Sequence, residues 1–136
     1  MSKLLERAKV KLENAQNDYD KIQKSDAYLD DCCFNLQQAI EFTLKYIVEM
    51  NGKEPVPTHD IRAQLNILDN NGVEIPQKDE VRNLSSTINS WVTESRYLDN
   101  FTATISDVSA AMSIAQALCD YCEGLVIEID NEEIEL

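Results

Sequence analysis

The chain has 136 residues, 43% of them hydrophobic, and its 25 acidic and 12 basic side chains give a formal charge of −13. This length and apolar content predict a single domain over residues 1–136 with a sizeable core, which excludes a disordered chain. The acidic balance excludes a protein that binds duplex DNA through a broad basic surface, because such a chain repels phosphates. Glycine and proline, with three residues each, are scarce, which favours long helices.

Two long helices are predicted in the first half of the chain. Apolar residues spaced three and four apart indicate a helix over residues 3–23, with the seam Leu5, Ala8, Leu12, Ala15, Tyr19 and Ile22. Ser25 is a good N-cap for a second helix, and Asp26 is favoured there by the helix dipole. Asn51 and Gly52 end this helix, because glycine readily takes the left-handed conformation found at helix ends. Its core face is Leu29, Cys32, Cys33, Leu36, Ala39, Ile40, Leu44, Ile47 and Val48.

Three further helices follow a connector with two prolines at residues 53–57, which cannot continue a helix. Thr58 is expected to cap a short third helix that ends at residues 70–72. A fourth helix should begin at residues 79–80 and close at residues 94–97. A fifth should open at residues 106–107 and end near residue 128. These elements predict an all-α, up-and-down bundle of four to five helices.

Positive charge is concentrated at the start of the chain. Residues 1–24 hold six bases and four acids, whereas the remainder holds six bases and 21 acids. The acidic segment 128–136 is expected to be a solvated, frayed end, with docking on a basic partner as the alternative. The basic first helix complements the acidic remainder of a second copy, which favours a homodimer.

No segment predicts a membrane span or a signal peptide. The longest uncharged stretch, Val108–Cys119, is shorter than the ~20 residues that a spanning helix needs. Glu6 and Arg7 occur before any apolar run develops at the N-terminus. We therefore expect a cytoplasmic protein that does not bind membranes.

Four cysteines fall on the core faces of the second and fifth predicted helices: Cys32, Cys33, Cys119 and Cys122. The second pair has the spacing of zinc ligands, and the first pair would complete four ligands. Adjacent cysteines on a helix, however, point about 100° apart and chelate one ion poorly. Asp120 and Glu123 also disfavour a thiolate in the second pair. Buried free thiols without a metal are therefore predicted, with zinc or an interhelical disulfide as the alternatives.

Two polar segments are candidates for a binding site. His59 is the only histidine of the chain, and we expect it in the first turn of the third helix, where the dipole disfavours the imidazolium. A local role at the corner before this helix is favoured over a catalytic one. Arg96 is the only base after Arg82, and with Tyr97 it offers a bidentate donor beside a ring, which suits an anion or a nucleobase. Pairing of Arg96 with Glu94 is the structural alternative. No phosphate-binding glycine loop or serine elbow is present in the sequence, and no cofactor is expected.

Three segments in order resemble the HEPN domain family. Residues 34–45, Phe-Asn-Leu-Gln-Gln-Ala-Ile-Glu-Phe-Thr-Leu-Lys, resemble its second-helix signature. Thr58-His59-Asp60-Ile61 is similar to the Thr-His-Asp-Leu corner that follows a proline-containing loop in the family. Glu94-Ser95-Arg96-Tyr97 resembles the acid-x-Arg-Tyr run that closes a later helix. The order and spacing of these motifs extend the resemblance over residues 25–125.

The resemblance implies a four- to five-helix bundle related to the C-terminal half of kanamycin nucleotidyltransferase, often dimeric. It implies a minimal nucleotidyltransferase as partner, in some cases in a toxin–antitoxin pair, and a nucleotide as a proposed ligand. Catalytic members of the family are metal-independent ribonucleases. In these, an arginine is followed after four to six residues by a histidine that activates the ribose 2′-hydroxyl.

This chain departs from the ribonuclease pattern. The positions where the histidine should follow Arg96 are Phe101, Thr102 and Ala103, and no arginine stands four to six residues from His59 on its N-terminal side. We therefore predict a noncatalytic module that partners a minimal nucleotidyltransferase, binds a nucleotide, or both. Its ligand-binding residues would be Glu94, Arg96, Tyr97 and His59. The alternatives are a divergent ribonuclease toxin that uses His59 or another group, and an inhibitor whose acidic faces bind a basic protein.

Overall fold

A computed structural model describes residues 2–92 and 103–135 of the chain. These residues form helices and loops without a strand, which confirms the predicted all-α bundle. The elements in order are α1 (Leu4–Tyr19), the short 3₁₀ helix η1 (Ile22–Lys24), α2 (Asp26–Met50), α3 (Ile61–Asn70), α4 (Lys78–Ser90) and α6 (Ile105–Glu135).

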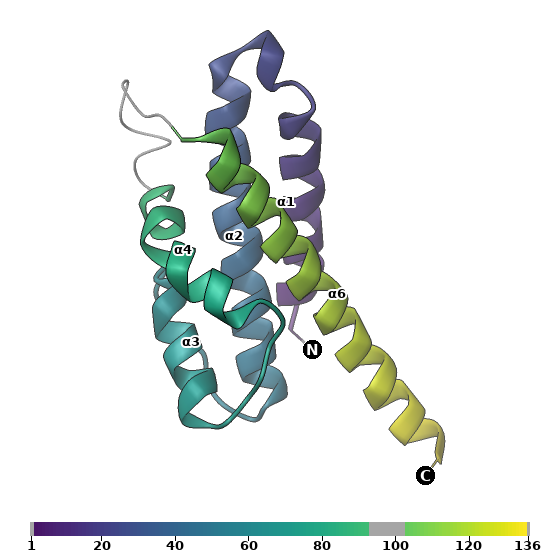
Figure 1. Ribbon diagram of the computed structural model, residues 1–136. Coiled ribbons are helices and arrows are strands. Elements are labelled where there is room, and N and C mark those ends of the chain that lie inside the picture. Colours follow the sequence, from purple (N-terminus) through teal and green to yellow (C-terminus); the bar gives the residue numbers. More distant parts are fainter. Residues whose placement is uncertain (1, 93–102, 136) are drawn as a thin grey trace.

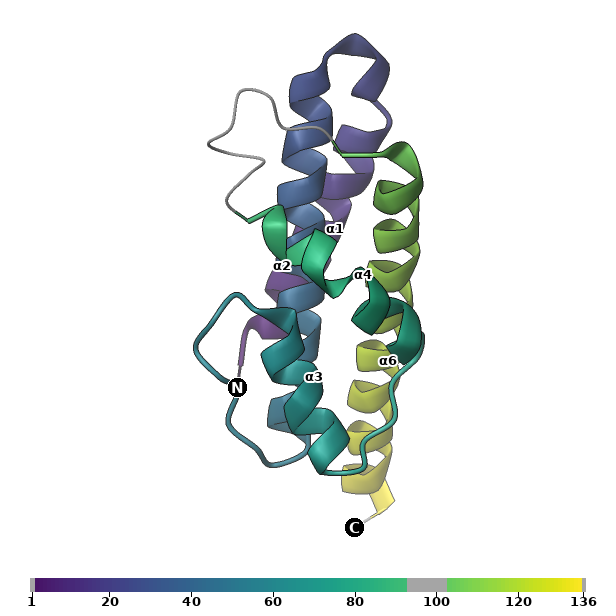
Figure 2. The same ribbon diagram turned by 60° about the vertical axis from the view of Figure 1, so that its left-hand side comes forward.

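The long helix α2 is the centre of the bundle and contacts α1, α3, α4 and α6 (Figure 1). α1 runs antiparallel to α2, and α6 runs in the same direction as α2 across α1 and α2. The connector over residues 51–60 carries the chain back along α2, so α3 also runs in the direction of α2 (Figure 2). The bundle therefore departs from simple up-and-down alternation at α3.

The ends of α2 follow from local chemistry, as the sequence predicts. The Ser25 hydroxyl accepts a hydrogen bond from the Ala27 N–H at 3.2 Å, which is the bond expected of an N-cap. After Met50 the chain leaves the helix through Gly52, whose φ of 74° is a left-handed value that glycine adopts without strain.

The start of α3 differs from the prediction. Asp60, not Thr58, is the N-cap, and its Oδ1 accepts from the Arg62 N–H at 2.9 Å. Thr58 acts one step earlier, because its hydroxyl accepts from the Asp60 N–H at 3.2 Å. His59 consequently lies before the helix and not, as the sequence predicted, in its first turn.

The last two helices, α4 and α6, also end at different residues from those predicted. α4 ends at Ser90, with Trp91 as its C-cap, earlier than predicted; the predicted close at residues 94–97 lies outside the described residues. α6 extends beyond residue 128 to Glu135, and its C-terminal part projects past the other helices (Figure 1). The segment suggested as a frayed tail is thus described as helix through residue 135.

The predicted apolar faces form one core. α2 provides the largest share, and α1 contributes small residues that allow the two helices to pack closely. The fully buried large side chains include Leu36, Ile40, Leu44, Ile47, Ile61, Leu65, Leu68, Ile88, Trp91, Ile114 and Leu118.

Residues Ile105–Asn131 of α6 are long and apolar enough, by length and composition alone, to span a membrane; an 18-residue window within them has a mean hydropathy of 1.2. Core helices of soluble proteins have the same properties. One face of α6 is such a core face, because it buries Val108, Ala111, Ile114, Ala115, Leu118, Cys119 and Cys122. We therefore assign α6 as a packing helix of the bundle.

Candidate functional site

A row of polar side chains crosses the otherwise apolar face of α2 that meets the connector. Gln37, Glu41 and Lys45 are four residues apart, which places them on one side of the helix. Gln37 is fully buried and Glu41 is 2% exposed. Buried polar groups of this kind require partners, because an unpaired charge in a core is costly.

The main partner of Glu41 is His59 on the connector. Glu41 Oε1 lies 2.8 Å from His59 Nδ1. A carboxylate only accepts hydrogen bonds, so Nδ1 carries the proton and the neutral ring has its lone pair on Nε2. The His59 side chain is 67% exposed, whereas the Glu41 side chain is 2% exposed. A buried carboxylate thus fixes the tautomer and orientation of a ring that solvent can reach.

Two further donors hold the Glu41 carboxylate. Lys45 Nζ lies 3.1 Å from Oε2, and Gln37 Nε2 donates to Oε1 at 2.9 Å. The Gln37 amide also lies 3.2 Å from the His59 carbonyl oxygen, so it connects α2 to the connector directly. Gln37 Oε1 is buried without a hydrogen-bond partner among the described residues. The ammonium of Lys45 compensates the charge that Glu41 brings into the bundle.

The connector is held in place by two residues outside this row. Gln64 on α3 is fully buried; its Nε2 donates to the Val56 carbonyl at 2.8 Å and its Oε1 accepts from the Val56 N–H at 3.2 Å. Asn89 on α4 donates to Asp60 Oδ1 at 2.7 Å. His59 is therefore positioned by α2, α3 and α4 together.

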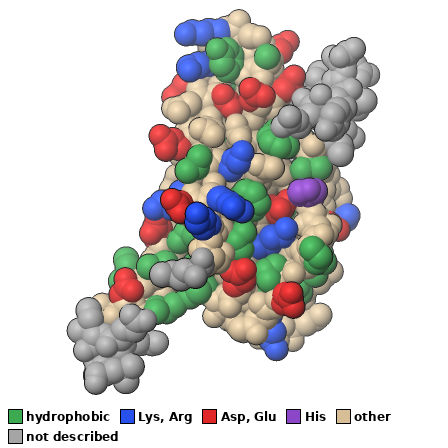
Figure 3. All heavy atoms as spheres, turned by 180° about the vertical axis from the view of Figure 1, so that it is seen from behind, with side chains coloured by type: hydrophobic (Ala, Val, Ile, Leu, Met, Phe, Trp, Pro, Cys, Tyr) green, Lys and Arg blue, Asp and Glu red, His purple; other side chains and the backbone are tan. Residues whose placement is uncertain are grey.

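The arrangement offers one solvent-facing nitrogen on a ring of fixed orientation. When neutral, Nε2 accepts a hydrogen bond, and when protonated it donates one to an anion. Basic side chains gather on the same face of the molecule as the histidine (Figure 3). This face therefore combines a histidine with nearby positive charge on a chain that is acidic as a whole.

Of the four predicted ligand-binding residues, the structure places His59 only. Glu94, Arg96 and Tyr97 lie outside the described residues, so their proximity to His59 remains a prediction. The sequence analysis did not assign Gln37, Glu41 and Lys45 to the site. Their signal was nevertheless present, because three polar residues spaced by four interrupt a strongly apolar helix.

The cysteines form no part of this site. All four are buried and free, as predicted. Cys32 Sγ donates to the Ala15 carbonyl at 3.4 Å, and burial raises the pKa of Cys32 and of Cys122 to about 12. Across residues 2–92 and 103–135, no three His, Cys, Asp or Glu side chains are grouped to hold a metal ion.

Comparison with known protein families gives a match over most of the chain. The family model described as HEPN domain matches residues 1–125. No curated protein and no solved structure gives a significant match to the chain.

Proposed function

The chain belongs to the HEPN domain family, and we propose that it is a noncatalytic binding module of that family, which partners a minimal nucleotidyltransferase, binds a nucleotide, or both. The observation that carries the proposal is His59, whose ring is oriented by the buried Glu41 and exposed to solvent. The departure of residues 101–103 from the ribonuclease pattern supports binding over cleavage. We further propose that the protein acts in the cytoplasm, in a pair of the toxin–antitoxin type.

The nucleotide half of the proposal places phosphate near His59 and Arg96. Both side chains donate hydrogen bonds to anions, the histidine when it is protonated and the arginine at any physiological pH. The ring of Tyr97, next to Arg96 in sequence, is suited to stack on a base.

Isothermal titration calorimetry with ATP and GTP tests the nucleotide half. We expect heat of binding with the wild type and at least about tenfold weaker binding for His59→Gln and for Arg96→Ala. Lys24→Ala, which removes an exposed positive charge elsewhere, is the matched control and should bind like the wild type. Absence of binding by the wild type, or equal binding by Arg96→Ala, contradicts the assignment of the site.

Co-purification tests the partner half. The chain is expressed with a tag together with the product of its adjacent reading frame. Recovery of a nucleotidyltransferase with the tagged chain is the expected result. An adjacent product of another class, or no recovery, contradicts the proposed nucleotidyltransferase partner. The proposed nucleotide binding is tested independently by the calorimetric titration.

A second candidate function is a divergent ribonuclease, and one observation favours it. A histidine with Nδ1 bonded to a carboxylate and Nε2 exposed has the arrangement of a general base. Cleavage of single-stranded RNA that is lost in His59→Gln and reduced in Glu41→Gln would support this function. Intact RNA and unaffected growth on induction would reject it.

A further inference from the structure

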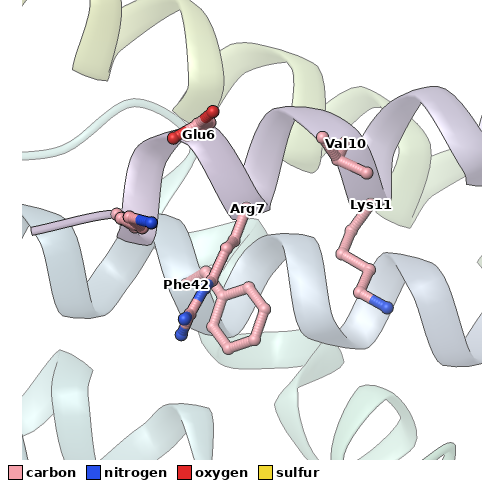
Figure 4. Close-up of a pocket in the computed structure, with 6 residues that line it drawn as sticks. Glu6, Arg7, Val10, Lys11 and Phe42 are labelled. Carbon is pink, nitrogen blue, oxygen red and sulfur yellow. The ribbon is translucent and has the colours of Figure 1, made fainter.

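A groove between α1 and α2 lies outside the set of residues that hold His59. Its volume is about 470 Å³, and its lining is Lys3, Glu6, Arg7, Val10, Lys11 and Phe42. The Arg7 side chain extends from α1 alongside the Phe42 ring, and Lys11 reaches toward α2 one turn further on, whereas Glu6 points away from α2 (Figure 4). The groove is thus bounded by basic side chains from α1 and an aromatic ring from α2.

The basic side chains of the groove form a row that has no acidic partner within residues 2–92 and 103–135. Lys3 directly precedes α1, and Arg7 and Lys11 follow at intervals of four residues, which separates the three by about 6 Å each along the helix axis. In the same part of the chain, the basic side chains that pair with acids are Lys9, Lys45, Arg62, Lys78 and Arg82. Because acids outnumber bases by 25 to 12, an unpaired basic row indicates a surface for an anionic partner.

The groove also supplies apolar surface beside these charges. Phe42 is partly buried against the core, and Val10 on α1 is 50% exposed. Arg7 has the planar fork that binds a carboxylate through two parallel hydrogen bonds, and its position along the Phe42 ring limits the freedom of its side chain. A partner that fits this groove therefore needs both carboxylates and apolar side chains.

We propose that the groove between α1 and α2 binds an acidic amphipathic helix of another protein. On a helix, carboxylates spaced by four residues lie about 6 Å apart along the axis, which is the spacing of Lys3, Arg7 and Lys11. Apolar residues beside those carboxylates, on the same face of the partner helix, contact Val10 and Phe42. An amphipathic helix in a groove is a recurring mode of recognition, in which apolar anchors give affinity and flanking charges give specificity.

An acidic helix fits this groove better than a nucleic acid does. A polynucleotide is charged along its whole length, so beyond the basic row its phosphates meet the acidic remainder of the chain and are repelled. The charges of a short acidic stretch in a protein can instead end where the row ends. His59 is held by Glu41 and Gln37, neither of which lines the groove, so this proposal does not depend on the function proposed for that site.

Fluorescence anisotropy with a labelled synthetic peptide tests the proposal on the full chain. The helical peptide has three glutamates spaced by four residues, with a leucine three residues after each, and the control peptide has glutamines in place of the glutamates. We expect saturable binding of the acidic peptide to the wild type. The control peptide should bind at least about tenfold more weakly, because its neutral amides replace charged partners of the basic row.

Charge reversal in the groove tests the same contact from the other side. Arg7→Glu/Lys11→Glu should weaken binding of the acidic peptide at least about tenfold. Lys21→Glu/Lys24→Glu makes the same charge change at exposed positions past the end of α1 and should bind like the wild type. This control is matched further, because Lys21 lies 5.7 Å from the centre of the Tyr28 ring and Lys11 also lies over an aromatic ring. The single substitution Arg7→Gln, which removes the guanidinium at an exposed position, should weaken binding at least about threefold.

Several results would overturn the proposal. These are no binding of the acidic peptide by the wild type, equal binding of the two peptides, and unchanged binding by both Arg7→Glu/Lys11→Glu and Arg7→Gln. A single-stranded oligonucleotide that displaces the peptide, and that binds Arg7→Gln more weakly than the wild type, would assign the groove to a nucleic acid. Sedimentation with and without the peptide tests for a second copy in the groove: a dimer of the chain that the peptide dissociates would replace the external partner by that copy.

Discussion

Asn89 on α4 bonds to both sides of the first turn of α3: its Nδ2 donates to Asp60 Oδ1 at 2.7 Å, and its Oδ1 accepts from the Ile61 N–H at 3.1 Å. A single amide thus satisfies the N-cap side chain and one of the backbone donors that a helix start leaves unpaired. The connector that carries His59 is fixed to α4 through this amide.

Asn89→Ala should therefore destabilise the protein. The Ile61 N–H loses its acceptor, and we expect the free energy of unfolding to fall by about 1–3 kcal/mol. Urea denaturation followed by circular dichroism measures this change. Asn83→Ala, at an exposed position of the same helix, is the control and should change stability by less than about 0.5 kcal/mol. Equal effects of the two substitutions would contradict the role of the amide.

Gln64→Glu should be destabilising in a pH-dependent way. The new carboxylate keeps an acceptor for the Val56 N–H but cannot donate to the Val56 carbonyl, and it places a charge at a fully buried position. We expect a loss of about 2–3 kcal/mol at neutral pH, recovered in part at acidic pH, where the protonated carboxyl donates again. Gln23→Glu, on the exposed 3₁₀ helix, should be close to neutral at both pH values. A loss of the same size at both pH values would point to packing instead.

The thiols should be unreactive in the folded protein. Burial, the main cause, raises the pKa of Cys119 to about 11 and of Cys32 to about 12, and it raises the pKa of Cys33 as well. Ellman's reagent at pH 8 should react slowly with the native chain, because its thiols are buried and protonated. In urea, which unfolds the chain, the reagent should react rapidly with all four thiols. Fast reaction of the native protein, or a lower melting temperature after a zinc chelator is added, would contradict buried, metal-free thiols.

The same pKa shifts set the behaviour in alkali. Because the folded thiols have a raised pKa, their contribution to stability is complete below the pKa of the unfolded thiol, near 8.5. This contribution is lost as the pH rises through the pKa values of the thiols in the folded protein. The free energy of unfolding should therefore decline above about pH 9. A flat profile of melting temperature between pH 8 and pH 11 would contradict this.

Asp18→Asn should stabilise the protein at neutral pH. Burial is the main cause that raises the pKa of Asp18, with Asp31 adding to it, while the hydrogen bond from Asn35 at 3.0 Å acts in the opposite direction. The folded protein therefore favours the protonated Asp18 carboxyl. This carboxyl contributes to the stability of the fold in acid, and the contribution is lost as the pH rises through its raised pKa. A neutral amide avoids the loss, and we expect a melting temperature about 2 °C higher at pH 7. At pH 3 the melting temperatures of the variant and the wild type should be equal. Asp20→Asn, at an exposed position, is the control and should leave the melting temperature unchanged at both pH values.

The ends of α2 could be predicted because they depend on neighbouring residues alone. Ser25 caps the helix through Ala27, two residues away, and Gly52 ends it through its own backbone conformation. The start of α3 could not be predicted in the same way. Thr58 and Asp60 are both good capping residues, and Asp60 receives the additional bond from Asn89, 29 residues away in sequence.

The candidate site could be predicted in part. His59 could be singled out because it is the only histidine, and its position in a corner with Thr58 and Asp60 follows from the sequence motif. Its bond to Glu41 is a tertiary contact across 18 residues, and it depends on the connector turning back along α2. No local rule gives that turn, so the sequence could not show which acid orients the ring.

The central place of α2 has a consequence for local opening. Its amide protons are covered by α1, α3, α4 and α6 together, so they become accessible only when several interfaces separate at once. In hydrogen–deuterium exchange, the middle of α2 should therefore exchange at the rate of global unfolding. The projecting end of α6, which has fewer neighbours, should exchange through fraying. The slowest-exchanging helix of the protein would then be the one that carries Glu41, so the ring of His59 is anchored to the part of the fold that opens last.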